Sequence, residues 1–176
     1  MTALSKAQTQ RLSPAIRLII FVVCYLLISF SYLQIPDETL AHTVYYHGVT
    51  RVCADVINGL FPKESVAAFQ NVLVSGQANL QIVRGCDGSG ALFLLVSAII
   101  AFPASVCWKL VGLVTGASLI YLINLIRIGG LYFIVVYRTD WFQLVHVYLA
   151  PSLIIILVCL FYAWWTGNTK TLAHGQ

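Results

Sequence analysis

Apolar residues in this chain gather into long runs that short polar segments separate. The clearest run covers residues 18–35, and further runs cover 91–106, 110–128 and 145–165. Because a helix needs about 20 residues to cross the hydrocarbon core of a bilayer, runs of this kind are typical of membrane spans. The pattern predicts an all-α fold, a polytopic membrane helical bundle with about four spans.

The segment 36–87 carries no such run. Between Leu40 and Leu60 its apolar residues recur at spacings near three and four, which predicts an amphipathic helix on the outer membrane face. We expect a second short helix at 63–69. The next residues, 71–84, alternate in polarity and fit either a short strand or an extended loop.

Two pairs of glycines bear on the third apolar run. Gly129 and Gly130 can break or bend a helix, and the apolar stretch after them is too short to cross a bilayer alone. Residues 129–138 therefore either continue a long, kinked span or re-enter the outer leaflet. Earlier in the run, Gly112 and Gly116 predict a small-residue face for close helix packing.

The composition agrees with membrane insertion. Hydrophobic residues make up 60% of the chain and charged residues only 9%, which lies outside the range of ordinary soluble domains. The net charge is only +4 and the basic residues are scattered, so we expect no nucleic-acid partner. The 5 cysteines show no CxxC pair or other metal-ligand spacing, so we expect no metal.

Basic residues set the expected orientation in the membrane. Lys6, Arg11 and Arg17 precede the first run, and Lys109 and Lys170 follow the second and the last. By the positive-inside rule both termini are cytoplasmic. No small-x-small site closes the first run, so we expect a retained helix rather than a cleaved signal peptide. The chain is then a single membrane domain (1–176), divided into a cytoplasmic N-terminus (1–17), a first span (18–35), an extracytoplasmic segment (36–87), catalytic helices (88–165) and a cytoplasmic tail (166–176).

This topology brings three chemically complementary side chains to the outer membrane face. Cys86 precedes the second span, Arg127 lies near the outer end of the third, and His146 begins the fourth. Ionisable residues at the edge of spans are costly and mark functional sites. A thiol before a helix N-terminus and near cations is activated, a histidine transfers protons, and an arginine holds a developing oxyanion. The three residues suffice for acyl transfer.

Neighbouring residues have expected supporting roles. Asn124 precedes Arg127 by almost one helical turn and shares its face. Asp87 or Ser89 can cap the second span, or Asp87 can instead pair with Arg127 and steady it. Three nearby glycines let a peptide backbone approach the thiol closely: Gly85, Gly88 and Gly90.

Each of the three central residues also has a purely structural interpretation. Arg127 can snorkel to the membrane interface, and His146 can belong to an aromatic belt in "WFQLVHVY". Cys86 can be a structural thiol, or it can pair with Cys53 in an oxidising compartment.

The chain resembles the exosortase and archaeosortase family of multi-pass membrane transpeptidases. The resemblance is carried by "GCDGSG" with Cys86, "NLIR" with Asn124 and Arg127, and "VHVY" with His146. It extends over residues 84–165 in the same helix order. The short chain is most like the compact type, exosortase H.

The resemblance implies a cysteine protease or transpeptidase of the cytoplasmic (inner) membrane, with its active site on the extracytoplasmic face and no cofactor. Its substrates would be exported proteins with a C-terminal sorting tail: a motif similar to Ile-Pro-Thr-Leu followed by Trp-Gly, a hydrophobic helix and a basic end. Cys86 would attack the peptide carbonyl and hold the protein as a thioester. Arg127 would stabilise or orient, and His146 would act as acid and base.

An unknown amine acceptor would make the enzyme a transpeptidase, and water would make it a protease. Membrane lipids would be its other partners. Asp87 departs from the family, because many members have a small or hydroxyl residue after the cysteine, and this leaves the local turn open.

Two other functions remain open. Ser89 in "DGSG" invites comparison with intramembrane serine proteases, with His146 as its partner, although an aspartate stands where their turn has its first glycine. Alternatively, the chain is a non-catalytic membrane scaffold or lipid-binding subunit. Arg127 would then contact an anionic headgroup, and Cys53 would be bonded to Cys86.

Overall fold

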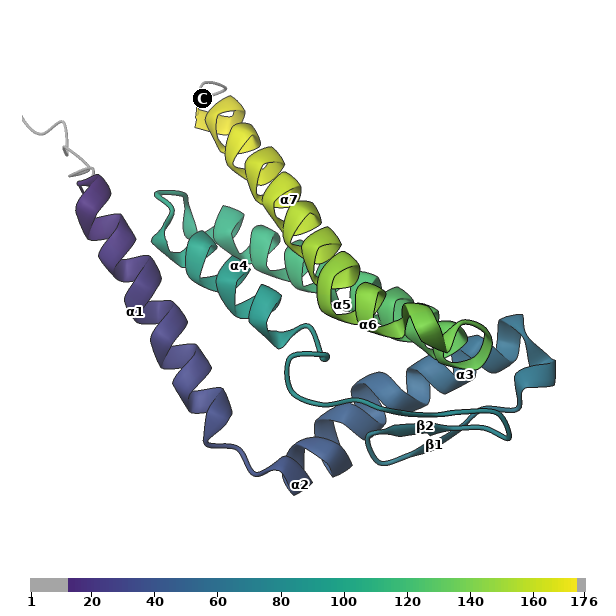
Figure 1. The fold of residues 1–176 in the computed structure, drawn as a ribbon. Helices are drawn as coiled ribbons and strands as arrows, with labels where there is room; N and C mark the ends of the chain where they lie inside the picture. The colour runs from purple at the N-terminus through teal and green to yellow at the C-terminus, as the bar shows by residue number, and fades with distance from the viewer. Residues whose placement is uncertain (1–12, 174–176) are drawn as a thin grey trace, which may run out of the picture.

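The computed structural model describes residues 13–173, so the parts of the predicted termini at 1–12 and 174–176 lie outside the described residues. The fold is mostly helical, and the described ends of its first and last helices lie at one end of the molecule, opposite a small sheet (Figure 1). In chain order the elements are α1 (Pro14–Leu33), α2 (Asp37–Thr39), η1 (Leu40–Thr50), α3 (Arg51–Leu60), η2 (Pro62–Glu64), β1 (Ala67–Phe69), β2 (Val72–Val74), β3 (Asn79–Gln81), α4 (Ser89–Ala101), α5 (Val106–Tyr137), η3 (Thr139–Trp141), α6 (Phe142–Leu144), η4 (Val145–Leu149) and α7 (Ala150–Ala173).

The amphipathic helix predicted between Leu40 and Leu60 is confirmed as the continuous run α2–η1–α3, whose middle part η1 is π-helical. Its inward side chains pack against the sheet and α5. The apolar periodicity is only partly buried, because Val44, Val56 and Leu60 lie on the exposed side. The buried side chains of the run are Leu40, Tyr45, Val49, Thr50, Cys53, Ala54 and Ile57.

The mostly helical fold agrees with the predicted all-α class, but a small three-stranded antiparallel sheet that the sequence did not predict follows α3, in the order β1-β2-β3. The predicted short helix at 63–69 is wrong: only the single turn η2 forms, and Ser65 then takes a left-handed conformation with φ 49°. Asn58 holds the next residue, Val66, by hydrogen bonds to its carbonyl and amide at 2.7 and 2.8 Å. The strand alternative for 71–84 is confirmed by β2 and β3.

The second apolar run forms α4, which ends at Ala101 rather than continuing to 106. Pro103 explains the early end, because the residue before a proline is pushed out of the helical region, and Phe102 is extended with φ −75° and ψ 138°. The Lys109 ammonium caps the free end by donating to the carbonyl of Ile100 at 2.7 Å.

The third run forms one continuous helix, α5, which passes through Gly129 and Gly130 without a break. The re-entrant alternative for 129–138 is therefore wrong. At 32 residues α5 is about 48 Å long, which exceeds the hydrocarbon thickness of a bilayer. Its last turns bind the sheet end of the molecule, because Tyr132 and Tyr137 donate hydrogen bonds to Glu64 at 3.0 and 2.5 Å.

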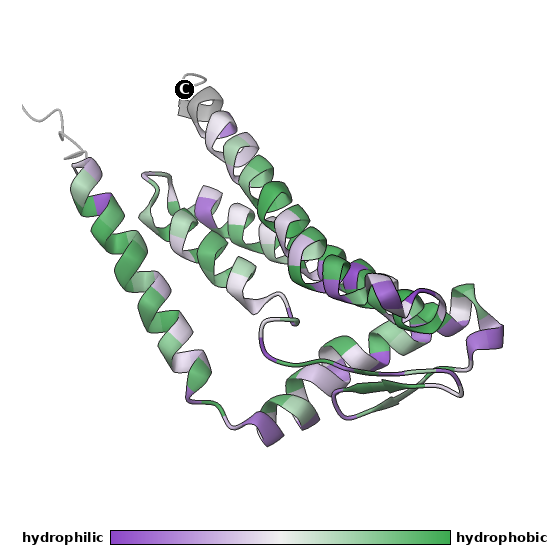
Figure 2. Cartoon of the chain, viewed as in Figure 1, coloured by the Kyte–Doolittle hydropathy of each residue, from purple (hydrophilic) through white to green (hydrophobic). Residues whose placement is uncertain are grey.

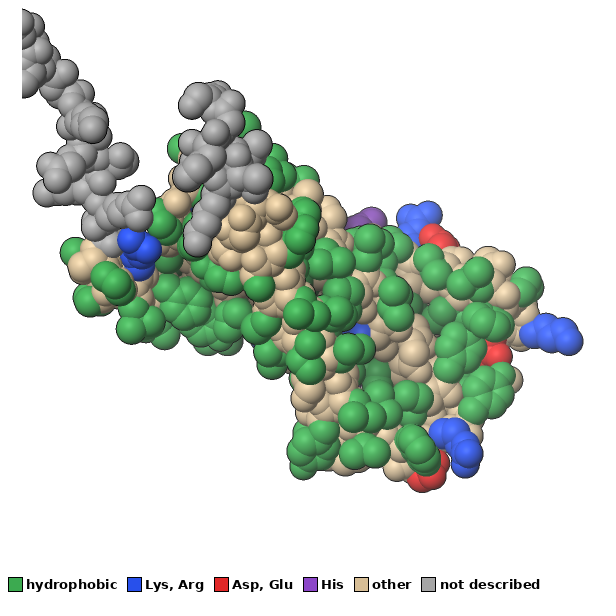
Figure 3. Space-filling model, turned by 90° about the horizontal axis from the view of Figure 1, so that it is seen from above, with side chains coloured by type: hydrophobic (Ala, Val, Ile, Leu, Met, Phe, Trp, Pro, Cys, Tyr) green, Lys and Arg blue, Asp and Glu red, His purple; other side chains and the backbone are tan. Residues whose placement is uncertain are grey.

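Three helical segments are long and apolar enough to cross a membrane: Pro14–Leu33, Val106–Tyr137 and Thr139–Thr169. The sequence predicted about four spans, but α4 has 13 residues and falls short of that length. Hydrophobic residues dominate α1 and much of α7 (Figure 2). In Figure 3 the acidic side chains in view all lie in the right-hand part of the molecule. The described fold is thus that of a mostly helical membrane protein.

The predicted small-residue face of α5 packs closely against two neighbouring helices. A Cβ at Gly112 would lie 2.5 Å from Nε1 of Trp165, a fully buried side chain on α7. A Cβ at Gly116 would lie 2.5 Å from Leu95 of α4 and 2.8 Å from Phe161 of α7. The α4–α5–α7 contact therefore depends on the absence of side chains at both positions.

We expect Gly112→Ala to lower the stability of the detergent-solubilised protein by about 1–3 kcal/mol, because the added methyl group overlaps the indole of Trp165. Gly130→Ala is the matched control on the same helix, since its Cβ meets nothing within 4 Å. Thermal unfolding followed by circular dichroism checks both. Equal midpoints for the two variants would contradict the packing described here.

Candidate active site

A tight loop, residues 84–88, carries Cys86 to the start of α4. Gly85 and Gly88 have φ values of 86° and 79°, a left-handed conformation that glycine adopts without strain. The Cys86 amide donates to the Val83 carbonyl at 2.9 Å and closes the turn. At Gly88 a Cβ would lie 3.1 Å from Cγ of Asn124, so glycine also lets this loop approach α5.

The imidazole of His146 lies next to the thiol of Cys86. Its Nε2 lies 3.5 Å from Sγ of Cys86, within hydrogen-bonding distance for sulfur. His146 belongs to η4, a short π-helical stretch of a kind often found at functional sites. The imidazole stacks on Phe142, with ring centroids 5.0 Å apart and planes inclined by 8°. Its Nδ1 is buried and has no hydrogen-bond partner among the described residues, so stacking rather than a carboxylate orients the ring.

Arg127 approaches Cys86 from α5. Its Nη1 donates long hydrogen bonds to the Cys86 carbonyl at 3.3 Å and to Oδ1 of Asn124 at 3.4 Å. Asn124 is only 3% exposed, so its amide is fixed in the helix contact. The Nε of Arg127 is buried without a partner in the described part of the chain. A buried donor of this kind is costly unless something binds it, which makes it available to a substrate oxygen.

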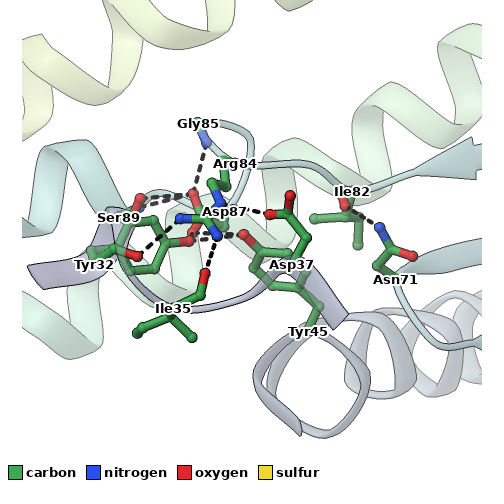
Figure 4. Close-up of polar contacts among 10 residues, drawn as sticks. All are labelled: Tyr32, Ile35, Asp37, Tyr45, Asn71, Ile82, Arg84, Gly85, Asp87 and Ser89. Carbon is green, nitrogen blue, oxygen red and sulfur yellow. Dashed lines mark hydrogen bonds and ion pairs between the residues drawn. The ribbon is translucent and has the colours of Figure 1, made fainter. Parts of the chain in front are cut away.

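Asp87 forms its hydrogen bonds with the turn around Cys86 and with two tyrosines, not with Arg127. Its Oδ1 accepts hydrogen bonds from the Gly85 amide at 3.1 Å, the Ser89 amide at 3.3 Å and the Ser89 hydroxyl at 2.9 Å. Its Oδ2 accepts from the hydroxyls of Tyr32 and Tyr45, which converge on it from α1 and η1 (Figure 4). The N-cap of α4 is Gly88, so neither Asp87 nor Ser89 caps the helix as predicted, although Asp87 binds the first helical amide, that of Ser89. The structure records no ion pair between Asp87 and Arg127.

Sequence reasoning missed the two tyrosines. Tyr45 is 3% exposed, and burial, with the Tyr32 hydrogen bond and the Asp87 charge, raises the pKa of its phenol. The two hydroxyls lie 2.8 Å apart. Only the position of Tyr45 on the buried face of the predicted amphipathic helix was a signal, and nothing in the sequence paired it with Asp87.

Arg84 joins the loop to the end of α1. Its guanidinium donates to Oδ1 of Asp37 at 2.7 Å, to the Tyr32 carbonyl at 2.9 Å and to the Ile35 carbonyl (Figure 4). It also lies over the Tyr32 ring, 5.3 Å from the centroid. A cation at the C-terminal carbonyls of a helix is stabilising, so Arg84 anchors the loop on α1.

A small cavity of about 80 Å³ opens beside the thiol and the imidazole. One wall is the chain from β3 toward the loop, and the other is formed by α5, α6 and η4. The lining residues are Leu80, Gln81, Ile82, Val83, Cys86, Ile128, Leu131, Phe142 and His146. The site therefore offers an apolar space that ends at a Cys–His pair.

Cys53 takes no part in this site. It is 2% exposed in the core between α3, the sheet and α5, and both Cys53 and Cys86 are free thiols. The alternative of a Cys53–Cys86 disulfide, which the sequence left open, is thus not found in the structure. Burial raises the pKa of the Cys53 thiol to about 11.

Comparisons with family models, with characterised proteins and with solved structures found no match to this chain. Within residues 13–173 no three His, Cys, Asp or Glu side chains come together as they would around a metal ion. The arrangement itself is what bears on function: a thiol and an imidazole from two separate elements meet at one cavity, and a guanidinium from a third element donates a hydrogen bond to the Cys86 carbonyl.

We expect the two inner thiols to differ sharply in alkylation. With a pKa of about 11, roughly one Cys53 thiol in 300 is ionised at pH 8.5, and its side chain is shielded as well. In a variant whose other cysteines (Cys24, Cys107 and Cys159) are replaced by serine, maleimide should label half-buried Cys86 and leave Cys53 unlabelled until the protein is unfolded. Mass spectrometry after timed labelling measures this. If neither thiol were labelled until a reducing agent was added, the two cysteines would form a disulfide, which would contradict a free Cys86 thiol at this site.

Proposed function

We propose that this chain is a cysteine-dependent membrane protease or transpeptidase that cleaves C-terminal sorting tails of exported proteins through a thioacyl intermediate. The proposal combines the exosortase-like resemblance with one geometric observation. Sγ of Cys86 lies 3.5 Å from Nε2 of His146, while Arg127 holds the Cys86 carbonyl. A nucleophile within reach of a base, with a cation beside it, is the arrangement that acyl transfer requires.

The reaction would proceed in two balanced steps. His146 Nε2 takes the proton of the Cys86 thiol, and Sγ bonds to the carbonyl carbon of the substrate, which becomes tetrahedral. The carbon–nitrogen bond then breaks, His146 returns the proton to the leaving amine, and a thioester remains on Cys86. An incoming amine or water then loses a proton to His146 and attacks the thioester carbonyl carbon. The carbon–sulfur bond breaks, and His146 returns that proton to Sγ, which restores the Cys86 thiol.

Arg127 would stabilise the negative charge that develops on the substrate oxygen. Its Nε is buried and unpaired, and its Nη1 hydrogen bonds are long, so the guanidinium has capacity for a further acceptor. A preorganised donor in an apolar site typically lowers the barrier by several kcal/mol. Asn124 would keep the guanidinium beside the thiol.

The length of α4 would place this chemistry where a membrane-anchored substrate begins. α4 has 13 residues and is therefore about 20 Å long, against a hydrocarbon core of about 30 Å. With the α4–α5 turn at the cytoplasmic surface, Cys86 would lie on the order of 10 Å inside the extracytoplasmic surface of the inner membrane. The residues that precede a tail's hydrophobic helix reach this depth.

The hydrogen bonds favour the cysteine over the serine alternative. Ser89 donates its hydroxyl to Oδ1 of Asp87 at 2.9 Å, whereas His146 Nε2 lies beside Cys86. A serine nucleophile would have to lose its proton to a base, and the group at its hydroxyl is the carboxylate that caps the turn.

Lipid binding stays a second candidate because of a specific feature. An apolar groove of about 420 Å³ lies between α5 and the η4–α7 helix, and Arg127 is the one charged residue in its lining. An acyl chain fits such a groove, with an anionic headgroup at the guanidinium. A non-catalytic lipid-binding subunit would need Arg127 but not the thiol of Cys86.

We expect Cys86→Ala to abolish removal of a sorting tail, with a loss of at least about 10³-fold in rate, because the nucleophile is gone. The test co-expresses each variant with a secreted reporter that ends in the tail of motif, apolar helix and basic end. Immunoblotting of the reporter's size in membrane and secreted fractions measures the cleavage.

Ser89→Ala is the matched control at the first residue of α4, next to the loop, and should retain cleavage within about tenfold, since it loses one hydrogen bond to Asp87. Equal cleavage by wild type and Cys86→Ala would overturn the proposed function. Loss of cleavage in Ser89→Ala, with cleavage retained in Cys86→Ala, would move the reaction to the serine.

A further inference from the structure

The sheet ends in an unpaired edge next to the candidate site. β3 is the last strand in the order β1-β2-β3, and within residues 13–173 its only strand partner is β2. The chain continues from β3 through Ile82 and Val83 directly into the loop that carries Cys86. A strand edge with free backbone groups is a ready template for another extended chain.

Hydrogen bonds at the end of β3 fix which backbone groups face that edge. The Ile82 amide donates to the Asn71 carbonyl at 2.7 Å, and Nδ2 of Asn71 donates to the Ile82 carbonyl at 2.8 Å (Figure 4). Leu80 lies directly opposite Leu73 of β2. Because neighbouring residues of an antiparallel strand turn to opposite sides, Leu80 and Ile82 face β2 while Asn79 and Gln81 direct their N–H and C=O groups outward.

The outward edge borders the cavity of the Cys–His pair. Leu80, Gln81, Ile82 and Val83 line one side of that space, and Cys86 and His146 close its end. Leu80 and Ile82 are buried in the core below the sheet, whereas Gln81 is exposed. The strand edge therefore leads along the cavity to the thiol of Cys86.

We propose that the substrate binds by adding a fourth strand to this sheet, with its segment next to the cleaved bond extended along β3. The inference rests on the proposed function and specifies its substrate class: an extended, unfolded peptide segment rather than a helix or a folded domain. The backbone of Gln81 would exchange hydrogen bonds with the peptide. One apolar side chain would enter the cavity of about 80 Å³, and the next would point away from it.

An extended segment fits the edge because a helical one satisfies its own backbone groups and gains nothing from β3. Strand addition also explains how one site can accept many proteins, since main-chain hydrogen bonds supply affinity and one pocket supplies selectivity. The unpaired edge could otherwise attract a second copy of this chain, and the experiment separates these occupants.

The test uses a synthetic tail peptide with Ile-Pro-Thr-Leu, Trp-Gly, an apolar helix and a basic end, in detergent with the full-length chain. N-methyl groups are placed one at a time on the non-proline residues of the motif and of its flanks, and acylation of Cys86 is followed by intact mass. Each lost hydrogen bond should slow acylation roughly three- to tenfold.

The expected result is an alternating pattern, because every second residue of an added strand faces β3. Residues at which N-methylation slows acylation should alternate with residues at which it has little effect. The proline of the motif should occupy a position of the second kind, since it has no N–H. A flat profile among peptides that do acylate Cys86 would overturn strand addition and leave the proposed function standing. No acylation by any peptide, including the unmodified one, would overturn both.

Gln81→Pro is the matching change on the chain, since it removes an outward N–H and leaves the bonds to β2 in place. We expect a rise in KM of three- to tenfold or more with kcat little changed. Gln81→Ala keeps the N–H and measures the part of that change that comes from loss of the side chain alone. If Gln81→Pro does not fold, the N-methyl profile decides alone. A dimer in the wild type that Gln81→Pro dissociates would assign the edge to a second copy and overturn the proposal.

Discussion

The close contact between the 84–88 loop and α5 is the constraint on which the site depends. Gly88 touches Asn124 where a Cβ would lie 3.1 Å from its amide carbon, and Arg127 donates to the Cys86 carbonyl from the next turn of α5. The loop therefore cannot move without breaking the hydrogen bond from the half-buried Arg127 guanidinium. Since unpaired charge inside a low-dielectric region is costly, this contact fixes both the backbone of Cys86 and the cation beside it.

The other side of the loop is tied to the N-terminal third of the chain. Arg84 donates a hydrogen bond to a carbonyl at the C-terminal end of α1, and Asp87 accepts hydrogen bonds from the hydroxyls of Tyr32 and Tyr45. These bonds make α1 and the amphipathic helix part of the site, although neither supplies a reacting group. A half-buried carboxylate with both oxygens in use positions the turn and leaves the thiol and imidazole free to react. The unpaired Nδ1 of His146 sets this pair apart from a triad with an orienting carboxylate.

Much of the helical fold could be predicted, because apolar runs and a period near 3.6 are local signals. The sheet could not, since Ser65 and Asn58 impose the extended chain through a left-handed residue and a side-chain bond rather than through periodicity. The continuity of α5 through Gly129 and Gly130 was also undecidable locally, because glycine weakens a helix but tertiary contacts determine whether it breaks. In the site, the meeting of Cys86, Arg127 and His146 followed from topology alone, and their catalytic roles stay predictions. The pairing of Asp87 with two distant tyrosines depends on tertiary packing that no sequence spacing encodes.

The most direct test of a thioacyl mechanism is to locate the covalent intermediate. The chain is purified with a tailed substrate, quenched in acid, digested and analysed by fragment mass spectrometry. The mechanism predicts that the substrate fragment ending at the newly formed C-terminus is attached to Sγ of Cys86. Hydroxylamine should remove this adduct, and Cys86→Ala should lack it. An adduct on Ser89, or continued cleavage with no adduct on Cys86 at any quench time, would contradict it.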